Sequence, residues 1–60
     1  MKTIYLNMNG NYGIETVDEF TQEQGQSEKD FRMYVNEMAR ETRLAGMPVY
    51  QSQRACKDWK

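Results

Sequence analysis

The side chains of this chain that could carry chemistry are its carboxylates and its one cysteine, because it contains no histidine. Histidine is the commonest general base and a frequent metal ligand, and zinc sites are usually built from cysteine and histidine together. A single cysteine also cannot form a disulfide within the chain. The composition therefore argues against zinc and restricts any catalytic hypothesis to carboxylates, Cys56, lysine or tyrosine.

Two pairs of carboxylates lie close in sequence, and neither spacing suits paired acid and base catalysis. Asp18 and Glu19 are adjacent in a predicted strand, so their side chains should point to opposite faces. Glu37 and Glu41 are four residues apart on a predicted helix, where they share the solvated face. We therefore expect ordinary surface carboxylates at both places, without a metal.

The cysteine and the glycines do not suggest an active site either. Cys56 lies between Arg54 and Lys57, and these cations could activate a thiol, but no base or orienting partner can be identified. Gly10 and Gly13 lack the strand-to-helix context and the lysine that a phosphate-binding loop requires. We expect a protein that binds no cofactor and is not an enzyme.

The elements that would position any site begin with a β-hairpin. Residues 2–8 alternate between apolar and polar side chains, which predicts a half-buried strand. The segment 9–13 reads Asn-Gly-Asn-Tyr-Gly, which is typical of a hairpin turn. A second strand is predicted over residues 14–20. Its apolar residues do not alternate cleanly, so we expect either a bulge or an early end near Asp18.

An amphipathic helix is predicted over residues 28–45. Ser27 followed by Asp30 resembles a capping box, and acidic residues suit the positive end of the helix dipole. Gly46 and Pro48 form a stop signal. The apolar face carries residues at helical spacing: Phe31, Tyr34, Val35, Met38 and Thr42.

A third strand is predicted from Val49 to about Lys57, half buried or ending in a tail that carries Trp59. The chain direction allows this strand to lie antiparallel beside the first. The predicted fold is a single α+β domain over residues 1–60, with a three-stranded antiparallel sheet in the pattern β-β-α-β. The strand order is 2-1-3, and the one helix packs on one face.

The charge is balanced overall and uneven along the chain. Eight basic and nine acidic residues give a net charge of −1, which argues against a field that attracts nucleic acid or an anionic membrane. Residues 15–30 carry six acids and one base, whereas residues 31–60 carry six bases and three acids. We expect an acidic end and a basic end, or simply a solvated surface of mixed sign. The acidic segment could also imitate nucleic-acid charge or dock on a basic host surface.

Membrane and compartment expectations follow from the absence of a long apolar run. No stretch approaches the ~18 apolar residues of a spanning helix. A free thiol fits a reducing compartment, so we expect a cytoplasmic protein. A chain of this size buries only about 60% of its unfolded surface. Without disulfides or a structural metal, self-association is the remaining stabilising device, and a homodimer is one expectation.

The candidate binding residues are mainly aromatic. The sheet face without a helix would carry Tyr5 and some of Tyr12, Tyr50 and Trp59. These side chains either complete the core or form a dimer or partner interface. Interface energy concentrates in tryptophan, tyrosine and arginine. The predicted partner-binding residues are therefore Tyr5, Tyr12, Tyr50, Arg54 and Trp59.

The chain resembles a group of short, uncharacterised proteins of bacteriophages and other mobile elements. The resemblance lies in the order Gly10-Asn11-Tyr12-Gly13, Glu15-Thr16-Val17-Asp18-Glu19-Phe20, a helix, and Tyr50-Gln51-Ser52-Gln53-Arg54 with Lys57 and Trp59. It spans most of the chain, implies a β-β-α-β domain in the bacterial cytoplasm, and assigns no residue a role.

Two functions are then expected from different classes. The first is a non-enzymatic, phage-type accessory module that binds a bacterial host or phage protein, with a defence or regulatory component as one kind of target. The alternative is a small nucleic-acid-binding factor. It would use the basic C-terminal end, where Arg54, Lys57 and Lys60 accompany Trp59.

Overall fold

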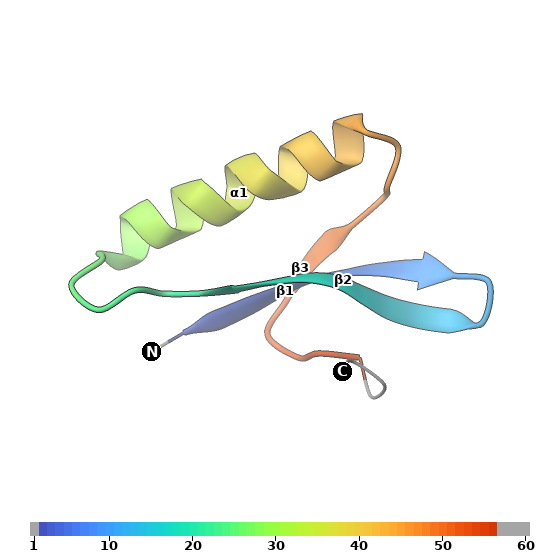
Figure 1. Cartoon of the computed structure of the whole chain (residues 1–60), viewed down its shortest axis with the longest axis horizontal. Helices are drawn as coiled ribbons and strands as arrows, with labels where there is room; N and C mark the ends of the chain where they lie inside the picture. The colour runs from blue at the N-terminus through green and yellow to red at the C-terminus, as the bar shows by residue number, and fades with distance from the viewer. Residues whose placement is uncertain (1, 57–60) are drawn as a thin grey trace.

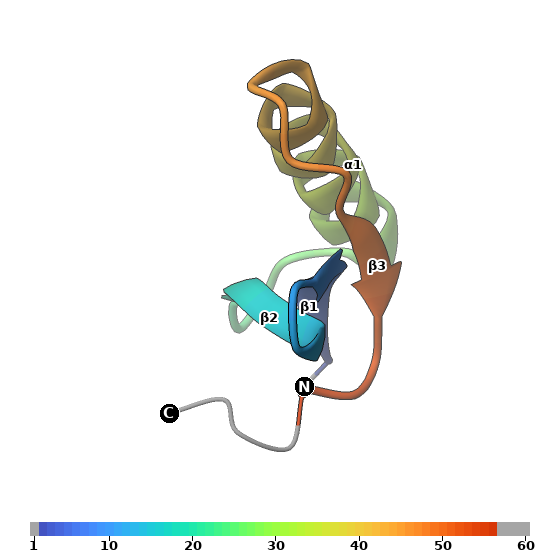
Figure 2. The ribbon, with the colours of Figure 1, turned by 90° about the vertical axis from the view of Figure 1, so that its right-hand side faces the viewer.

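The computed structural model describes residues 2–56. The elements are β1 (Thr3–Gly10), β2 (Gly13–Thr21), α1 (Glu28–Leu44) and β3 (Tyr50–Ser52). The strands form one antiparallel sheet in the order β2-β1-β3, and α1 lies on one side of it (Figures 1 and 2). The predicted β-β-α-β fold with strand order 2-1-3 is confirmed.

The hairpin contains the irregularity that its sequence predicts. Leu6 pairs with Asp18 while Asn7 pairs with Thr16, so Val17 is an extra residue in β2 and forms a β-bulge. The bulge explains the broken alternation, because it lets Val17 pack against the core from the same strand as Phe20. The expected bulge is therefore confirmed, and β2 continues beyond Asp18.

The helix begins at the predicted cap. The Ser27 hydroxyl accepts a hydrogen bond from the backbone N–H of Asp30 at 3.1 Å. Gly46, just beyond the C-terminal cap, has a φ of 103°, a value that glycine adopts without strain. Its N–H donates to the carbonyl of Arg43 at 3.0 Å, so the backbone turns out of the helix here.

The core is small and lies between α1 and the sheet. Its central cluster joins one residue from β1, one from α1 and one from the loop before β3. Half-buried apolar residues pack against this cluster, and two further residues of α1 are fully buried. The cluster is Leu6, Ala39 and Val49, the half-buried residues are Met8, Val17 and Phe20, and the further residues are Phe31 and Val35.

The third strand is shorter than the sequence predicts. A strand from Val49 to about Lys57 was expected, whereas β3 contains only Tyr50–Ser52. Val49 lies before it in the core, and Lys57 lies outside the described residues. The strand ends because the Ser52 hydroxyl accepts a hydrogen bond from the Arg54 N–H at 3.1 Å, which turns the backbone out of the ladder.

After this turn, residues 53–56 run below the sheet, on the side away from α1 (Figure 2). The Asn7 amide donates to the Arg54 carbonyl at 3.0 Å, and the Cys56 N–H donates to the Thr16 hydroxyl at 2.7 Å. That hydroxyl donates in turn to the Asn7 side-chain carbonyl at 2.6 Å. Asn7 and Thr16 are therefore buried polar residues with their hydrogen bonds satisfied.

Candidate functional site

The candidate site is a strip of apolar side chains between α1 and β2, with a cleft at one end, which we call the α1–β2 groove. In Figure 2, α1 lies above β1 and β3, and β2 extends beyond it on one side. The helix-facing side chains of β2 are therefore only half covered. We define the α1–β2 groove by four residues, two from each element. They are Val17, Phe20, Tyr34 and Met38.

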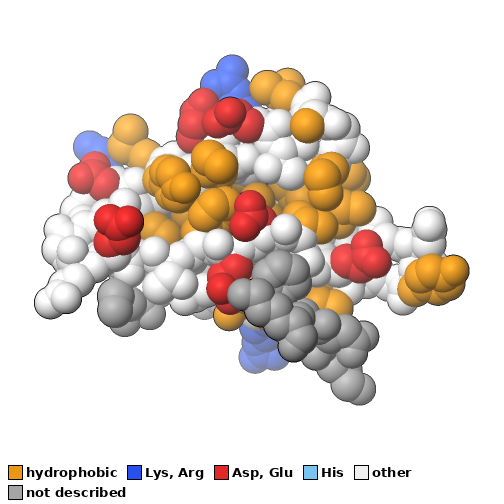
Figure 3. Space-filling model, in the orientation of Figure 1, with side chains coloured by type: hydrophobic (Ala, Val, Ile, Leu, Met, Phe, Trp, Pro, Cys, Tyr) orange, Lys and Arg blue, Asp and Glu red, His pale blue; other side chains and the backbone are white. Residues whose placement is uncertain are grey.

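An aromatic pair connects the two walls of the groove. The rings of Phe20 and Tyr34 have centroids 5.6 Å apart and planes at 88°, an edge-to-face contact. Tyr34 is nevertheless 50% exposed and Phe20 is half-buried. A cleft of 380 Å³ opens beside this pair, where β2 passes into the connector to α1. Figure 3 shows the apolar surface running along the boundary between helix and strand.

Carboxylates border the groove on both sides. Along α1, the residues three and four apart on this flank are Asp30, Tyr34, Glu37 and Glu41. Along β2, Asp18 is opposite Leu6 and so lies on the α1 side of the sheet. Glu23 lines the cleft itself. Glu19 also lines it, but its pairing with Tyr5 directs its side chain to the other face of the sheet. The other five carboxylates are exposed, and acidic side chains flank the apolar strip in Figure 3.

The opposite flank of α1 is basic. Its cations are Lys29, Arg32, Arg40 and Arg43. This flank faces β3, since the Arg43 guanidinium donates to the Val49 carbonyl at 3.3 Å and the Gln51 amide donates to Asn36. The sequence predicted either an acidic and a basic end or a solvated surface of mixed sign. Within α1 the charges are separated across the helix, because α1 supplies residues to both flanks.

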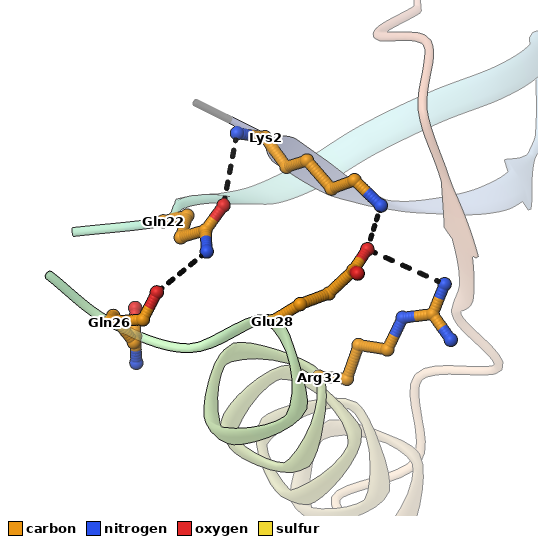
Figure 4. Close-up of polar contacts among 5 residues, drawn as sticks. All are labelled: Lys2, Gln22, Gln26, Glu28 and Arg32. Carbon is orange, nitrogen blue, oxygen red and sulfur yellow. Dashed lines mark hydrogen bonds and ion pairs between the residues drawn. The ribbon is translucent and has the colours of Figure 1, made fainter. Parts of the chain in front are cut away.

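One carboxylate outside the groove forms ion pairs with cations and stabilises the fold. Glu28 accepts a hydrogen bond from the Lys2 ammonium and lies 3.8 Å from the Arg32 guanidinium (Figure 4). The hydrogen bond from Lys2, together with the charges of Lys2 and Arg32, lowers the pKa of Glu28. Gln22 joins the same region, because its amide donates to the Gln26 carbonyl at 2.8 Å. These contacts fix the start of α1 against the start of β1.

Two slightly smaller clefts lie on the β3 side of α1. Each has a volume of 330 Å³, and both include Ile4, Arg32 and Gln53. They form because β3 ends early and leaves the first residues of β1 without a neighbouring strand on that side. The charged residues that line them are Lys2 in one cleft and Arg32 in both, and Glu28 pairs with both of these cations. The α1–β2 groove is the better candidate because it contains the exposed side of an aromatic pair.

The residues predicted to bind a partner do not form one site. Tyr5 and Tyr50 share the sheet face opposite α1, with Tyr5 half-buried and Tyr50 42% exposed. Tyr12 is 98% exposed in the hairpin turn, several residues further along β1 and β2. Arg54 is exposed, with its carbonyl bonded to Asn7. Trp59 lies outside the described residues.

The α1–β2 groove was not predicted from the sequence. The spacing of Tyr34 indicates only the apolar face of the helix, and that of Glu37 and Glu41 indicates solvated surface. The available signal was the acidic stripe beside Tyr34 together with the strand order 2-1-3, which makes β2 an edge strand. Combining the two would have pointed to an exposed boundary between helix and edge strand.

Other chemistry is not apparent in the described part of the chain. Within residues 2–56, no three His, Cys, Asp or Glu side chains gather in a way that could hold a metal ion. Over the same residues, α1 is too polar to span a bilayer. The Cys56 thiol donates to the Ile14 carbonyl and packs under the sheet.

Comparisons with protein-family models, curated proteins and solved structures returned no match for this chain. The resemblance to phage and mobile-element proteins therefore stays a prediction, and the assignment of the groove depends on its geometry.

Proposed function

We propose that this domain is a non-enzymatic module that binds another protein through the α1–β2 groove. The observation that carries the proposal is the half-exposed aromatic pair of Phe20 and Tyr34, which has exposed carboxylates on both its α1 side and its β2 side. Exposed apolar strips with polar borders are typical of interaction surfaces. Aromatic residues in such strips often contribute most of the binding energy.

The shape of the groove favours a macromolecule over a small ligand. Small-molecule sites usually bury 70–90% of the ligand in a concave pocket. The α1–β2 groove instead lies open along the β2 side of the domain (Figure 3). A partner helix or loop can lie along it without any opening motion.

The resemblance supplies the biological context of this proposal. It implies a domain of the bacterial cytoplasm that acts as a phage-type accessory protein and whose partner is a host or phage protein. A component of bacterial defence or regulation is one kind of target. The groove itself is independent of that context.

A second candidate function is nucleic-acid binding through the basic flank of α1. Lys29, Arg32, Arg40 and Arg43 provide a row of cations, which could contact phosphates. Two of them already have contacts, because Arg32 lies near Glu28 and Arg43 bonds the Val49 carbonyl. Phosphate contacts predict binding that weakens steeply between ~50 and ~200 mM salt, which fluorescence anisotropy would measure. An oligonucleotide that does not bind at low salt would eliminate this candidate.

Site-specific photo-crosslinking tests the main proposal. A photoreactive phenylalanine analogue is placed at Tyr34 or, as a matched control, at Tyr50, which is a tyrosine of similar exposure on the other side of the sheet. Illumination of bacterial cells expressing each variant should give a discrete protein adduct for position 34 only. An adduct for position 50 only would move the interface to the sheet face opposite α1. No adduct at either position would contradict the binding-module proposal.

A further inference from the structure

The partner of the α1–β2 groove can be characterised from the charge of its borders. Five carboxylates border the groove, namely Asp18, Glu23, Asp30, Glu37 and Glu41, although the whole chain has a net charge of only −1. Glu28, which pairs with Lys2 and Arg32, is not one of the five. Complementary charge steers association and excludes wrong partners. A partner surface with basic residues on both sides of an apolar strip fits this groove.

The outer edge of β2 argues against a partner that adds as a strand. Strand addition needs a regular row of backbone donors and acceptors along the edge. The bulge at Val17 interrupts that row. The Asp18 carboxylate also accepts a hydrogen bond from the Glu19 N–H at 2.8 Å, so this donor is already used. Bulges and charged residues are common protections of edge strands.

A second copy of the chain fits the groove poorly. A two-fold dimer through this surface would place like carboxylates against each other, which is unfavourable. Placing the basic flank of one copy in the groove of the next would be a head-to-tail contact, which does not close unless a ring forms. The charges therefore favour a different protein.

The length of the groove matches a helix. Val17 and Phe20 are three residues apart, and because Val17 is the extra residue of the bulge they span about 7–10 Å along β2. One to two turns of a helix, from residue i to residue i+4 or i+7, span about 6–10 Å. A partner helix could therefore place apolar side chains at i, i+3 or i+4, and i+7 along the floor of the groove.

We infer that the α1–β2 groove binds a basic amphipathic helix of another protein, with an apolar stripe over the groove and Lys or Arg along both sides of that stripe. This inference rests on the proposed function and specifies the chemistry of its partner.

Three synthetic peptides of about 15 residues test the inference against the full chain. The first is helical, with leucine at i, i+3 and i+7 and lysine on both sides. The second has glutamate in place of each lysine, and the third has the first peptide's composition in scrambled order. Titration into ¹⁵N-labelled protein should give saturable shifts around Phe20, Tyr34 and Met38 with the first peptide only. Equal binding of the second or third peptide, or no binding of the first, would overturn the inference.

A pair of variants with equal charge change checks the location. The double variant Glu37→Gln with Glu41→Gln should bind the basic peptide about fivefold more weakly, since it removes two exposed charge contacts. Asn11→Lys with Gln53→Lys also raises the net charge by two units, at exposed positions outside the groove, and should bind as the wild type. Equal weakening in both pairs would mean a general charge effect and would contradict the inference.

The outcomes separate this inference from the proposed function. A partner that crosslinks at Tyr34 but contains no basic helix would leave the binding module in place and overturn the basic-helix inference. Self-association that shifts the same groove residues would identify a second copy as the occupant and also overturn it.

Discussion

Replacing Thr16 by valine should destabilise the domain far more than the small change in side-chain shape suggests. The Thr16 hydroxyl is buried, donates to the Asn7 side chain at 2.6 Å and accepts from the Cys56 N–H at 2.7 Å. Valine keeps the shape and removes both bonds, so a buried carbonyl and the Cys56 N–H lose their partner. A buried unsatisfied group costs about 1–3 kcal/mol, and the strand preference of valine offsets part of this cost. We therefore expect a loss of about 2 kcal/mol in the free energy of unfolding.

The expected loss is large for this chain. A domain of 60 residues has a total stability of roughly 3–9 kcal/mol at the usual value per residue. Urea unfolding followed by far-ultraviolet circular dichroism measures the loss as a lower midpoint with little change in slope. Hydrogen exchange at the Cys56 amide should become faster, because residues 53–56 lose a contact with the sheet.

Thr21→Val is the matched control. Thr21 lies in the same strand, but its hydroxyl is exposed and lies 3.2 Å from that of Thr3. Its replacement should change the stability by less than about 0.5 kcal/mol. Equal midpoints for the Thr16 and Thr21 variants would refute the reasoning, since the segment after β3 would then not depend on the buried hydroxyl.

Three further predictions concern the helix start, the Glu28 ion pairs and the core. Ser27→Ala should cost about 1 kcal/mol in urea unfolding, because it removes the cap of α1, and an unchanged midpoint would contradict this. The pKa of Glu28 should lie below that of an ordinary glutamate in a ¹³C titration. Because this pKa is lowered in the folded state, its stabilising contribution should be present above the unfolded pKa and lost as the pH falls through the folded value; Glu28→Gln should abolish that part of the pH dependence. An ordinary pKa at Glu28 would mean that the Lys2 contact is absent in solution. Leu6→Ala should cost about 2–5 kcal/mol and leave the chain largely unfolded by circular dichroism; a cooperative transition at the wild-type midpoint would contradict the assigned core.

The elements set by local interactions could be predicted from the sequence. The alternation over residues 2–8, the Asn-Gly-containing turn and the Ser27 cap each act within a few residues along the chain. The bulge could also be predicted, since the apolar residues of β2 switch from even to odd sequence positions at Val17. Strand order followed from the direction of the chain and the single helix.

The end of β3 could not be predicted because non-local contacts determine it. Residues 49–57 alternate well enough for a strand, and the same pattern suits a segment that crosses a sheet face. The choice depends on Asn7 and Thr16, which are about 40 residues away in sequence and bind the backbone of Arg54 and Cys56. A local pattern contains no information about these partners.

The groove was missed for a related reason. The sequence places Tyr34 on the apolar side of α1. It does not determine where α1 lies across the sheet. Because α1 lies over β1 and β3, Tyr34 reaches only the edge of the core and stays half-exposed beside Phe20. The tyrosines that the sequence favoured, Tyr5 and Tyr50, lie on the sheet face that residues 53–56 cross.

The most direct test of the groove as the binding surface compares Tyr34→Ala with Tyr50→Ala in affinity for the protein captured by crosslinking. Both variants remove a half-exposed tyrosine, so circular dichroism and urea unfolding should show folded domains in both cases. Calorimetric titration should give an affinity weakened about tenfold or more for Tyr34→Ala and unchanged for Tyr50→Ala. A folded Tyr34→Ala variant with wild-type affinity would contradict the account.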